Sequence, residues 1–218
     1  MSSILVRDLI ETYKYFKYKE VIALVKGGNI SKGDQDMFTT VVTLWNINEK
    51  IIDHNKIYPK SGGKLIRIRP SDNKIKEQRR EVVKYWDKFF KLFPSVTKFI
   101  NDSKENRKTY RVGGGNFLLR PIAQKSIFEI MILFEDLTDP MLNKLKKLPL
   151  KLNNKFWHYI LWEPHKSTML FNKSLVVNYI KYNIGIELKK KELEILSKSY
   201  KKNTGDLELN LPAAKFLS

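Results

Sequence analysis

The chain has 218 residues, and its 42% hydrophobic content is enough to build a packed core in one large domain or two small ones. It contains no cysteine, which excludes disulfide bonds, thiolate metal sites and cysteine nucleophiles. Its 41 Lys and Arg residues against 23 Asp and Glu give a net charge of +18, which attracts polyanions such as nucleic acid. Most of these cations are lysines in a chain rich in Ile and Asn, as is usual for AT-rich genomes, so a merely solvated basic surface is the alternative.

The sequence predicts neither a membrane segment nor a secretion signal. No run of about 18 uncharged apolar residues is present. The first residues, Met1 to Arg7, have neither the long apolar stretch nor the cleavage site of a signal peptide. We therefore expect a cytoplasmic protein with no membrane partner.

Apolar residues recur every three or four positions along much of the chain, the pattern of amphipathic helices. The segments predicted to be helical are 4–25, 34–52, 74–92, 95–101, 122–137, 138–148, 172–184 and 189–200. Thr39 to Thr43 in the second segment are mostly β-branched, which disfavours a helix there. The pattern predicts a mainly α protein: an irregular multi-helix bundle with long basic loops and at most a short β element.

We expect a single helical domain over residues 1–218. A possible subdivision lies near 102–115, separating an N-terminal helical part, 1–101, from a C-terminal helical part, 116–200, and a tail, 201–218. Residues 102–115 are polar and end in three glycines, so we expect this segment to be too flexible for regular structure. Pro121 is expected in the first turn of the following helix.

The three glycines, 113–115, could also let backbone amides approach an anion at the start of the next helix, where Arg111 and Arg120 could hold a phosphate. The segment has neither the Gly-Lys-Ser/Thr ending of a P-loop nor the spacing of a dinucleotide site. A flexible connector, a contact to a DNA backbone and a nucleotide site all remain open on sequence alone.

No catalytic centre, metal site or cofactor site is predicted. The three histidines, His54, His158 and His165, do not have metal-ligand spacing. The acidic residues near the end of the 122–137 helix have no nuclease pattern, and we interpret them as solvated charges: Glu129, Glu135, Asp136 and Asp139. No nucleophile-elbow motif supports Ser-His-Asp catalysis.

The basic residues are most coherent between positions 60 and 84, where a glycine-containing loop leads into the 74–92 helix. A loop and an adjoining helix can follow a phosphate backbone, because phosphate contacts need positive charge and reach. Four of the eight arginines lie in this window, where a codon bias towards lysine would not place them. The predicted nucleic-acid-binding residues are Lys60, Lys64, Arg67, Arg69, Lys74, Lys76, Arg79, Arg80, Arg111 and Arg120, with Lys84 close by. Tyr85 and Trp86 have apolar helix spacing and are predicted to be core residues.

Three groups of short motifs resemble the C-terminal half of the DGQHR-domain proteins, which include the DndB-like proteins associated with DNA phosphorothioate modification. The motifs are Asn29-Ile30-Ser31-Lys32 with Asp36-Met37-Phe38-Thr39-Thr40, then Arg69-Pro70-Ser71 before a helix with Tyr85-Trp86, and Asn116-Phe117-Leu118-Leu119-Arg120-Pro121-Ile122-Ala123-Gln124. They span about residues 29–137, with looser similarity over 157–184. The Asp-Gly-Gln-His-Arg motif itself is absent. The resemblance implies the C-terminal portion of such a protein, in a bacterial or phage DNA-modification, defence or regulatory context.

Three hypotheses follow. The first is a non-catalytic DNA-binding accessory or regulatory protein that contacts the phosphate backbone of duplex DNA. The second is a protein-interaction module that docks onto a partner subunit carrying the catalytic or ParB-like part. That partner would supply the N-terminal portion that this chain lacks. The third is a cryptic nuclease or other enzyme.

Overall fold

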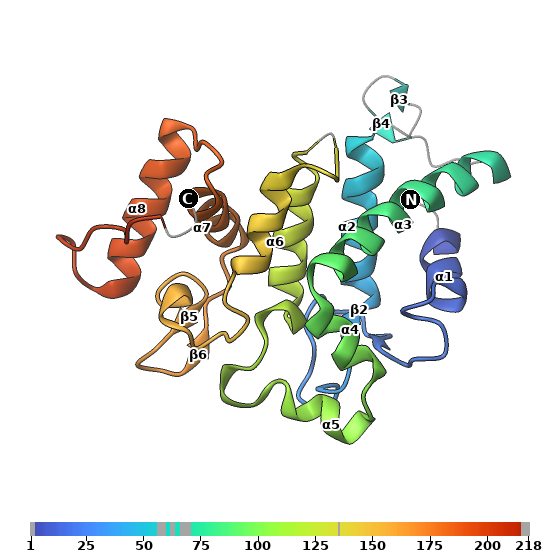
Figure 1. Ribbon diagram of the computed structural model, residues 1–218, viewed down its shortest axis with the longest axis horizontal. Helices are drawn as coiled ribbons and strands as arrows, with labels where there is room; N and C mark the ends of the chain where they lie inside the picture. The colour runs from blue at the N-terminus through green and yellow to red at the C-terminus, as the bar shows by residue number, and fades with distance from the viewer. Residues whose placement is uncertain (1–2, 56–59, 62–63, 66–70, 135, 215–218) are drawn as a thin grey trace.

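The computed structural model describes residues 3–55, 60–61, 64–65, 71–134 and 136–214, and it is mainly helical (Figure 1). The α-helices are α1 (Ser3–Thr12), α2 (Val41–His54), α3 (Asp72–Leu92), α4 (Pro94–Asn101), α5 (Lys104–Thr109), α6 (Pro121–Met131), α7 (Lys173–Ile184) and α8 (Lys190–Thr204). The 3-10 helices are η1 (Val112–Gly114), η2 (Phe117–Leu119), η3 (Pro140–Lys147) and η4 (Lys155–Trp157). The predicted mainly α fold class is confirmed.

The strands are two residues long and form separate pairs. They are β1 (Ile22–Ala23), β2 (Thr39–Thr40), β3 (Lys60–Ser61), β4 (Lys64–Leu65), β5 (Trp162–Glu163) and β6 (Thr168–Met169). β1 pairs in parallel with β2, whereas β3–β4 and β5–β6 are antiparallel pairs. The β structure therefore ties loops together and forms no layer of the fold.

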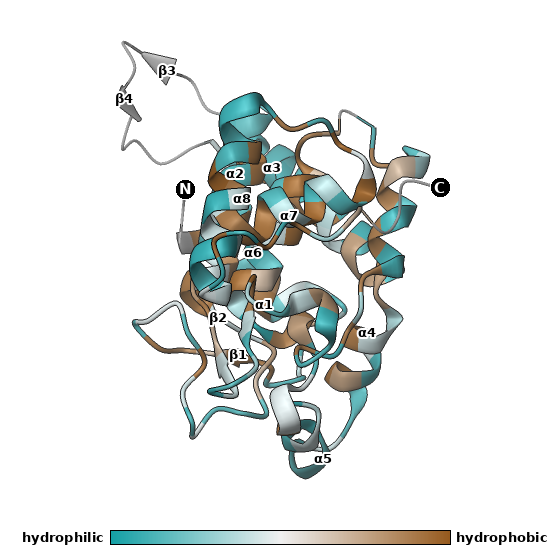
Figure 2. Ribbon diagram, turned by 90° about the vertical axis from the view of Figure 1, so that its left-hand side faces the viewer, coloured by the Kyte–Doolittle hydropathy of each residue, from teal (hydrophilic) through white to brown (hydrophobic). Residues whose placement is uncertain are grey.

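Helix α6 stands in the middle of the molecule (Figure 1). It packs against α2 and α3 on one side and against α7 on the other, and α8 covers α7. One hydrophobic core runs through these helices and includes residues from Leu5 to Tyr200. Figure 2 shows hydrophobic and hydrophilic residues alternating along the helices, as expected for helices with one buried face.

Helix α3 follows directly from its sequence. Ser71 caps it, because its hydroxyl accepts a hydrogen bond from the backbone N–H of Lys74. Pro94 begins α4 immediately beyond its end. The prediction of a helix over 74–92 is confirmed. The helix begins two residues earlier, at Asp72, directly after the Ser71 cap.

The predicted helix over residues 4–25 is wrong beyond Thr12. The chain turns after α1, and Tyr18 and Glu20 have positive φ angles of 59° and 46°, which a right-handed helix does not allow. Residues Ile22 and Ala23 then form β1. The apolar spacing continues through this turn because Phe16 and Val21 still face the core.

The predicted helix over 34–52 begins later, at Val41. Thr39 and Thr40 form β2, and the hydroxyl of Thr40 accepts a hydrogen bond from the backbone N–H of Thr43. The β-branched stretch therefore supplies a strand and a helix cap, in line with its low helix propensity. The helix predicted over 122–137 is also shorter, since α6 ends at Met131.

The expectation that residues 102–115 are too flexible for regular structure is wrong. Ser103 caps α5, and η1 follows with its glycines at positive φ. Gly115 has φ +65°, and a Cβ at this position would meet the backbone of Tyr110 and Arg111. Glycine is needed here for a close backbone approach in an ordered turn.

Aromatic side chains fill the centre of the core. Trp86 and Phe89 lie against Phe128 of α6, with ring centroids 4.4 and 5.1 Å apart. The indole N–H of Trp86 donates to the side-chain oxygen of Asn48, 2.9 Å away. Tyr85 and Trp86 are 4% and 0% exposed, which confirms the prediction that they are core residues.

The C-terminal part contains α7, which ends at Gly185 with φ +87°, and α8, which continues to Thr204 before Gly205. Both helices were predicted. The prediction ended α8 at Tyr200, four residues early, because the polar last turn has no apolar periodicity.

Candidate nucleic-acid interface

The hairpin β3–β4 carries the loop part of the predicted interface and lies between α2 and α3 in sequence (Figure 1). Lys60 and Lys64 are strand residues whose side chains lie outside the described part. Arg67 and Arg69 also lie outside the described residues. Of the predicted loop and helix, the structure therefore describes side chains only in the helical part.

The cations in the first half of α3 are largely paired with carboxylates. Lys74 Nζ lies 2.7 Å from Glu77. Arg79 Nε lies 2.6 Å from Asp8 of α1, and its Nη2 donates to the hydroxyl of Thr12. Arg79 thus joins α3 to α1, which gives it a role in packing that the sequence did not indicate.

Five cations nevertheless follow one another along the outer side of α3, at spacings of four, four, four and three residues. This α3 row consists of Lys76, Arg80, Lys84, Lys88 and Lys91. All are exposed except the partly buried Lys88. Glu81 pairs with Arg80 and Lys84, at 3.5 and 2.7 Å. Exposed ion pairs contribute only about 0–1 kcal/mol, so such a carboxylate does not prevent these cations from meeting a phosphate.

The α3 row is extended by a cation from a distant part of the chain. η3 packs against α3, and Lys146 lies close enough to Lys88 for its charge to affect the pKa of Lys88. Burial together with the charges of Lys91 and Lys146 lowers the pKa of Lys88, although Asp136 and Asp139 oppose the shift. The sequence prediction missed this proximity, and its only signal was the lysine-rich composition of residues 144–147.

Arg111, the first of the two arginines near the glycines, is buried. It is 6% exposed and its guanidinium donates to the backbone carbonyls of Gln35, Leu119 and Met37 at 2.9, 2.7 and 2.6 Å. Burial, with a contribution from the nearby Arg120, lowers its pKa to about 9. The structure gives Arg111 the role of joining three chain segments, in place of the phosphate contact predicted from sequence.

Arg120 is also held inside the fold. Its Nη2 donates to the carbonyl of Gly114 at 3.1 Å, and burial lowers its pKa. The Arg120 side chain thus bonds to the backbone of the glycine turn. The glycines therefore form a structural turn that lies next to the buried Arg111 and is bonded by the partly buried Arg120.

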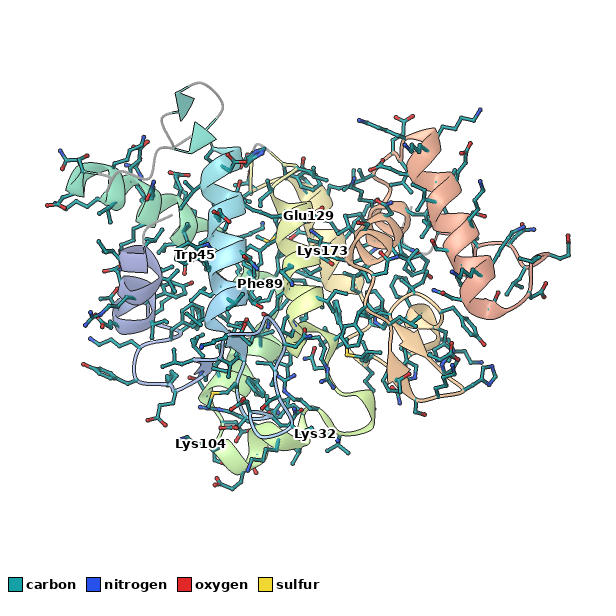
Figure 3. The ribbon with its side chains drawn as sticks, turned by 180° about the vertical axis from the view of Figure 1, so that it is seen from behind. Lys32, Trp45, Phe89, Lys104, Glu129 and Lys173 are labelled. Atoms are coloured by element: carbon teal, nitrogen blue, oxygen red, sulfur yellow. The ribbon has the colours of Figure 1, made fainter. Side chains whose placement is uncertain are left out.

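A second group of lysines surrounds Glu129 of α6, and Figure 3 shows Glu129 next to Lys173. Lys50 of α2 and Lys173 of α7 both lie 2.6 Å from the same oxygen of Glu129. Burial alone would raise the pKa of Glu129, but the hydrogen bonds from Lys173 and Lys50 outweigh it and lower the pKa. Burial, then the charges of Lys173 and Lys50, lowers the pKa of Lys125. Glu129 is thus an ion bridge between three helices.

The remaining acidic and histidine residues are accounted for by local contacts. Asp136 accepts from Thr138, and Asp139 caps η3 through the N–H of Met141, whereas Glu135 lies outside the described residues. His158 contacts the carbonyl of Asn153, and His165 the hydroxyl of Tyr159. Within the described residues, no group of three or more His, Asp or Glu side chains is arranged to hold a metal ion.

Comparison with known proteins adds no assignment, because no protein-family model, curated protein or solved structure matches this chain. In the described part of the chain, no helix is both long enough and apolar enough to cross a membrane.

Proposed function

We propose that this protein binds duplex DNA, without catalysis, through contacts to the phosphate backbone. The observation that carries the proposal is the α3 row, five cations on one side of a single helix, extended by Lys146 of η3. From Lys76 to Lys91 the row spans about 22 Å at 1.5 Å per residue. This is about the rise of six base pairs, so one helix could contact several consecutive phosphates.

The basic hairpin between α2 and α3 would extend this surface beyond the N-terminal end of α3. Lys60, Lys64, Arg67 and Arg69 belong to that part of the proposal. Because phosphate contacts carry no sequence information, we expect affinity without strong sequence preference from the row itself.

Two variants with equal charge test the proposal. The first changes Lys76, Arg80 and Lys91 to alanine, and the second changes Lys190, Lys191 and Lys198 of α8, all exposed, to alanine. Each variant lowers the net charge by three. Fluorescence anisotropy with a labelled duplex measures their affinities.

We expect the α3 variant to lose about 500-fold in affinity near 0.1 M salt, since each of the three lost phosphate contacts contributes about 0.9 decade there. The α8 variant should lose less than about threefold. Equal losses would mean that the total charge, and not the α3 row, determines binding, and would contradict the proposal.

We further propose the bacterial or phage DNA-modification or defence context that the DGQHR resemblance implies. In support, two of the matched segments meet in space. The amide of Gln124, from the Asn116–Gln124 segment, donates to the backbone carbonyls of Phe38 and Leu118, each at 3.0 Å. If the matched segments belong to one domain of the DGQHR type, they should pack against one another, as these two segments do.

A protein-docking role is the second candidate, and the last helix favours it. Leu193 and Ile195 of α8 are 42% and 46% exposed. Copurification with the product of a neighbouring gene, lost in Leu193→Glu/Ile195→Glu and retained in the α3 variant, would support docking through α8. Copurification that survives the α8 substitutions would exclude this surface.

A further inference from the structure

The turn between α1 and β1 holds one aromatic ring out in solvent. Tyr18 is 89% exposed, the highest value among the large hydrophobic side chains of the described residues. Its φ angle is +59°, an uncommon and costly backbone conformation for a bulky residue. A strained backbone conformation persists only where the surrounding structure fixes it. The contacts on either side of Tyr18 therefore show whether the fold holds its side chain in solvent.

The turn is fixed on its inner side by two aromatic neighbours of Tyr18. Phe16 is 2% exposed and packs edge-on against Trp86, at 5.4 Å between ring centroids. Tyr15 stacks on Phe90 of α3, at 3.9 Å. Both rings point into the protein, and the backbone N–H of Lys19 donates back to the carbonyl of Phe16.

The far end of the turn is fixed by α5. The buried guanidinium of Arg107 donates to the carbonyl of Lys19 at 3.1 Å and to that of Ile100 at 2.9 Å. Lys104, labelled in Figure 3, pairs with Glu20. Tyr18 is thus held outward by contacts on both sides of it.

The surroundings of the ring are basic. The ammonium group of Lys17 lies 4.8 Å from the ring centroid of Tyr18, a cation–π contact. Lys14 of the same turn pairs with Asp87 of α3, at 2.9 Å. Asp87 stands between Lys84 and Lys88 in the helix, so the turn lies beside the α3 row.

An exposed aromatic ring on a turn that packs against a row of cations suits an unpaired base, because the base stacks on the ring while the cations contact the backbone of its strand. We infer that Tyr18 is a base-stacking residue for an unpaired base of a nucleic-acid strand bound along the α3 row. The inference rests on the proposed nucleic-acid binding and adds a preference for sites with exposed bases. The basic surroundings favour this ligand over an apolar protein surface.

The test uses a short single strand that carries 2-aminopurine, whose fluorescence falls when the base stacks, beside a fully paired duplex of the same sequence. The variants are Tyr18→Ala, Tyr18→Phe and Leu24→Ala. Leu24 is 79% exposed and provides a matched loss of exposed apolar surface without a ring.

We expect the wild-type protein to quench 2-aminopurine. Tyr18→Ala should lose this quenching and bind the single strand about 5- to 100-fold more weakly, which corresponds to one stacked base. Tyr18→Phe and Leu24→Ala should stay within about threefold of the wild type. All variants should bind the paired duplex equally.

Duplex binding by the wild-type protein without quenching would overturn the stacking role and leave the proposed function intact. Quenching with no duplex binding would support stacking and overturn the duplex proposal. No binding to either probe would overturn both. Equal losses in Tyr18→Ala and Leu24→Ala would replace stacking with a general apolar contact and overturn the inference.

Discussion

Substitution of Arg111 distinguishes a structural guanidinium from a phosphate-binding one. Arg111→Met keeps an apolar stem in the buried site and removes the bonds to the carbonyls of Gln35, Met37 and Leu119. A hydrogen bond from a charged donor contributes about 1.5 kcal/mol or more, so the loss of three bonds should lower the free energy of unfolding by about 4.5 kcal/mol or more. This loss is a large part of the stability of an ordinary domain, about 5–15 kcal/mol.

Urea denaturation followed by tryptophan fluorescence measures this loss, and Arg80→Met is the matched control. Arg80 is an exposed member of the α3 row with its side chain 70% accessible, so its loss should cost less than about 1 kcal/mol. The effects on DNA affinity should be the reverse of the effects on stability. Arg80→Met should weaken DNA binding, whereas Arg111→Met, under conditions in which it is folded, should bind DNA as tightly as the wild type. A stability loss below about 1 kcal/mol in Arg111→Met, together with weaker DNA binding, would refute the structural role.

Four further substitutions test particular features of the fold. Glu129→Gln should lower stability by about 1–3 kcal/mol at neutral pH. The pKa of Glu129 is lowered in the folded protein, so its contribution is present above the ordinary carboxyl pKa and disappears as the pH falls through the folded value. The stabilities of the two proteins, measured by urea denaturation, should therefore converge as the pH falls below the folded pKa of Glu129. Gly115→Ala should cost about 3 kcal/mol in the same assay, because its Cβ meets backbone, whereas Gly113→Ala, with open space and only a positive φ, should cost about 1 kcal/mol. Tyr18→Asn should stabilise the protein by up to about 1 kcal/mol and so raise its melting temperature slightly, because asparagine tolerates positive φ. A clear fall in the melting temperature would contradict the strain at Tyr18.

The sequence predicted those parts of the fold in which local and tertiary preferences agree. α3 has a serine cap, a regular apolar face and a proline just beyond its end, and its prediction was nearly complete. The prediction of a helix over 4–25 was wrong because the apolar residues keep helical spacing across a turn. The positive φ angles of that turn, at Tyr18 and Glu20, cannot be predicted from these residue types. The prediction that residues 102–115 are flexible was wrong because the buried Arg107 and Arg111 order this segment. Their side chains donate hydrogen bonds to the carbonyls of Lys19 and Met37, which are distant in sequence.

The same distinction applies to the candidate interface. The exposed face of α3 was predicted because charge and helical periodicity are local properties. The proximity of Lys146 to Lys88 depends on the packing of η3 against α3, which no local pattern contains. Arg111 was assigned to a phosphate because charge alone does not distinguish an exposed guanidinium from one that bonds to backbone carbonyls.

The salt dependence of duplex binding tests the central claim most directly. If the five cations of the α3 row and Lys146 each neutralise one phosphate, they contribute about −5 to the slope of a plot of log affinity against log salt concentration, and contacts from the hairpin between α2 and α3 would make the slope steeper. The variant without Lys76, Arg80 and Lys91 should have a slope shallower by about 3 than that of the wild type, and the α8 variant should keep the wild-type slope. A wild-type slope near zero, or an unchanged slope in the α3 variant, would contradict phosphate binding by this helix.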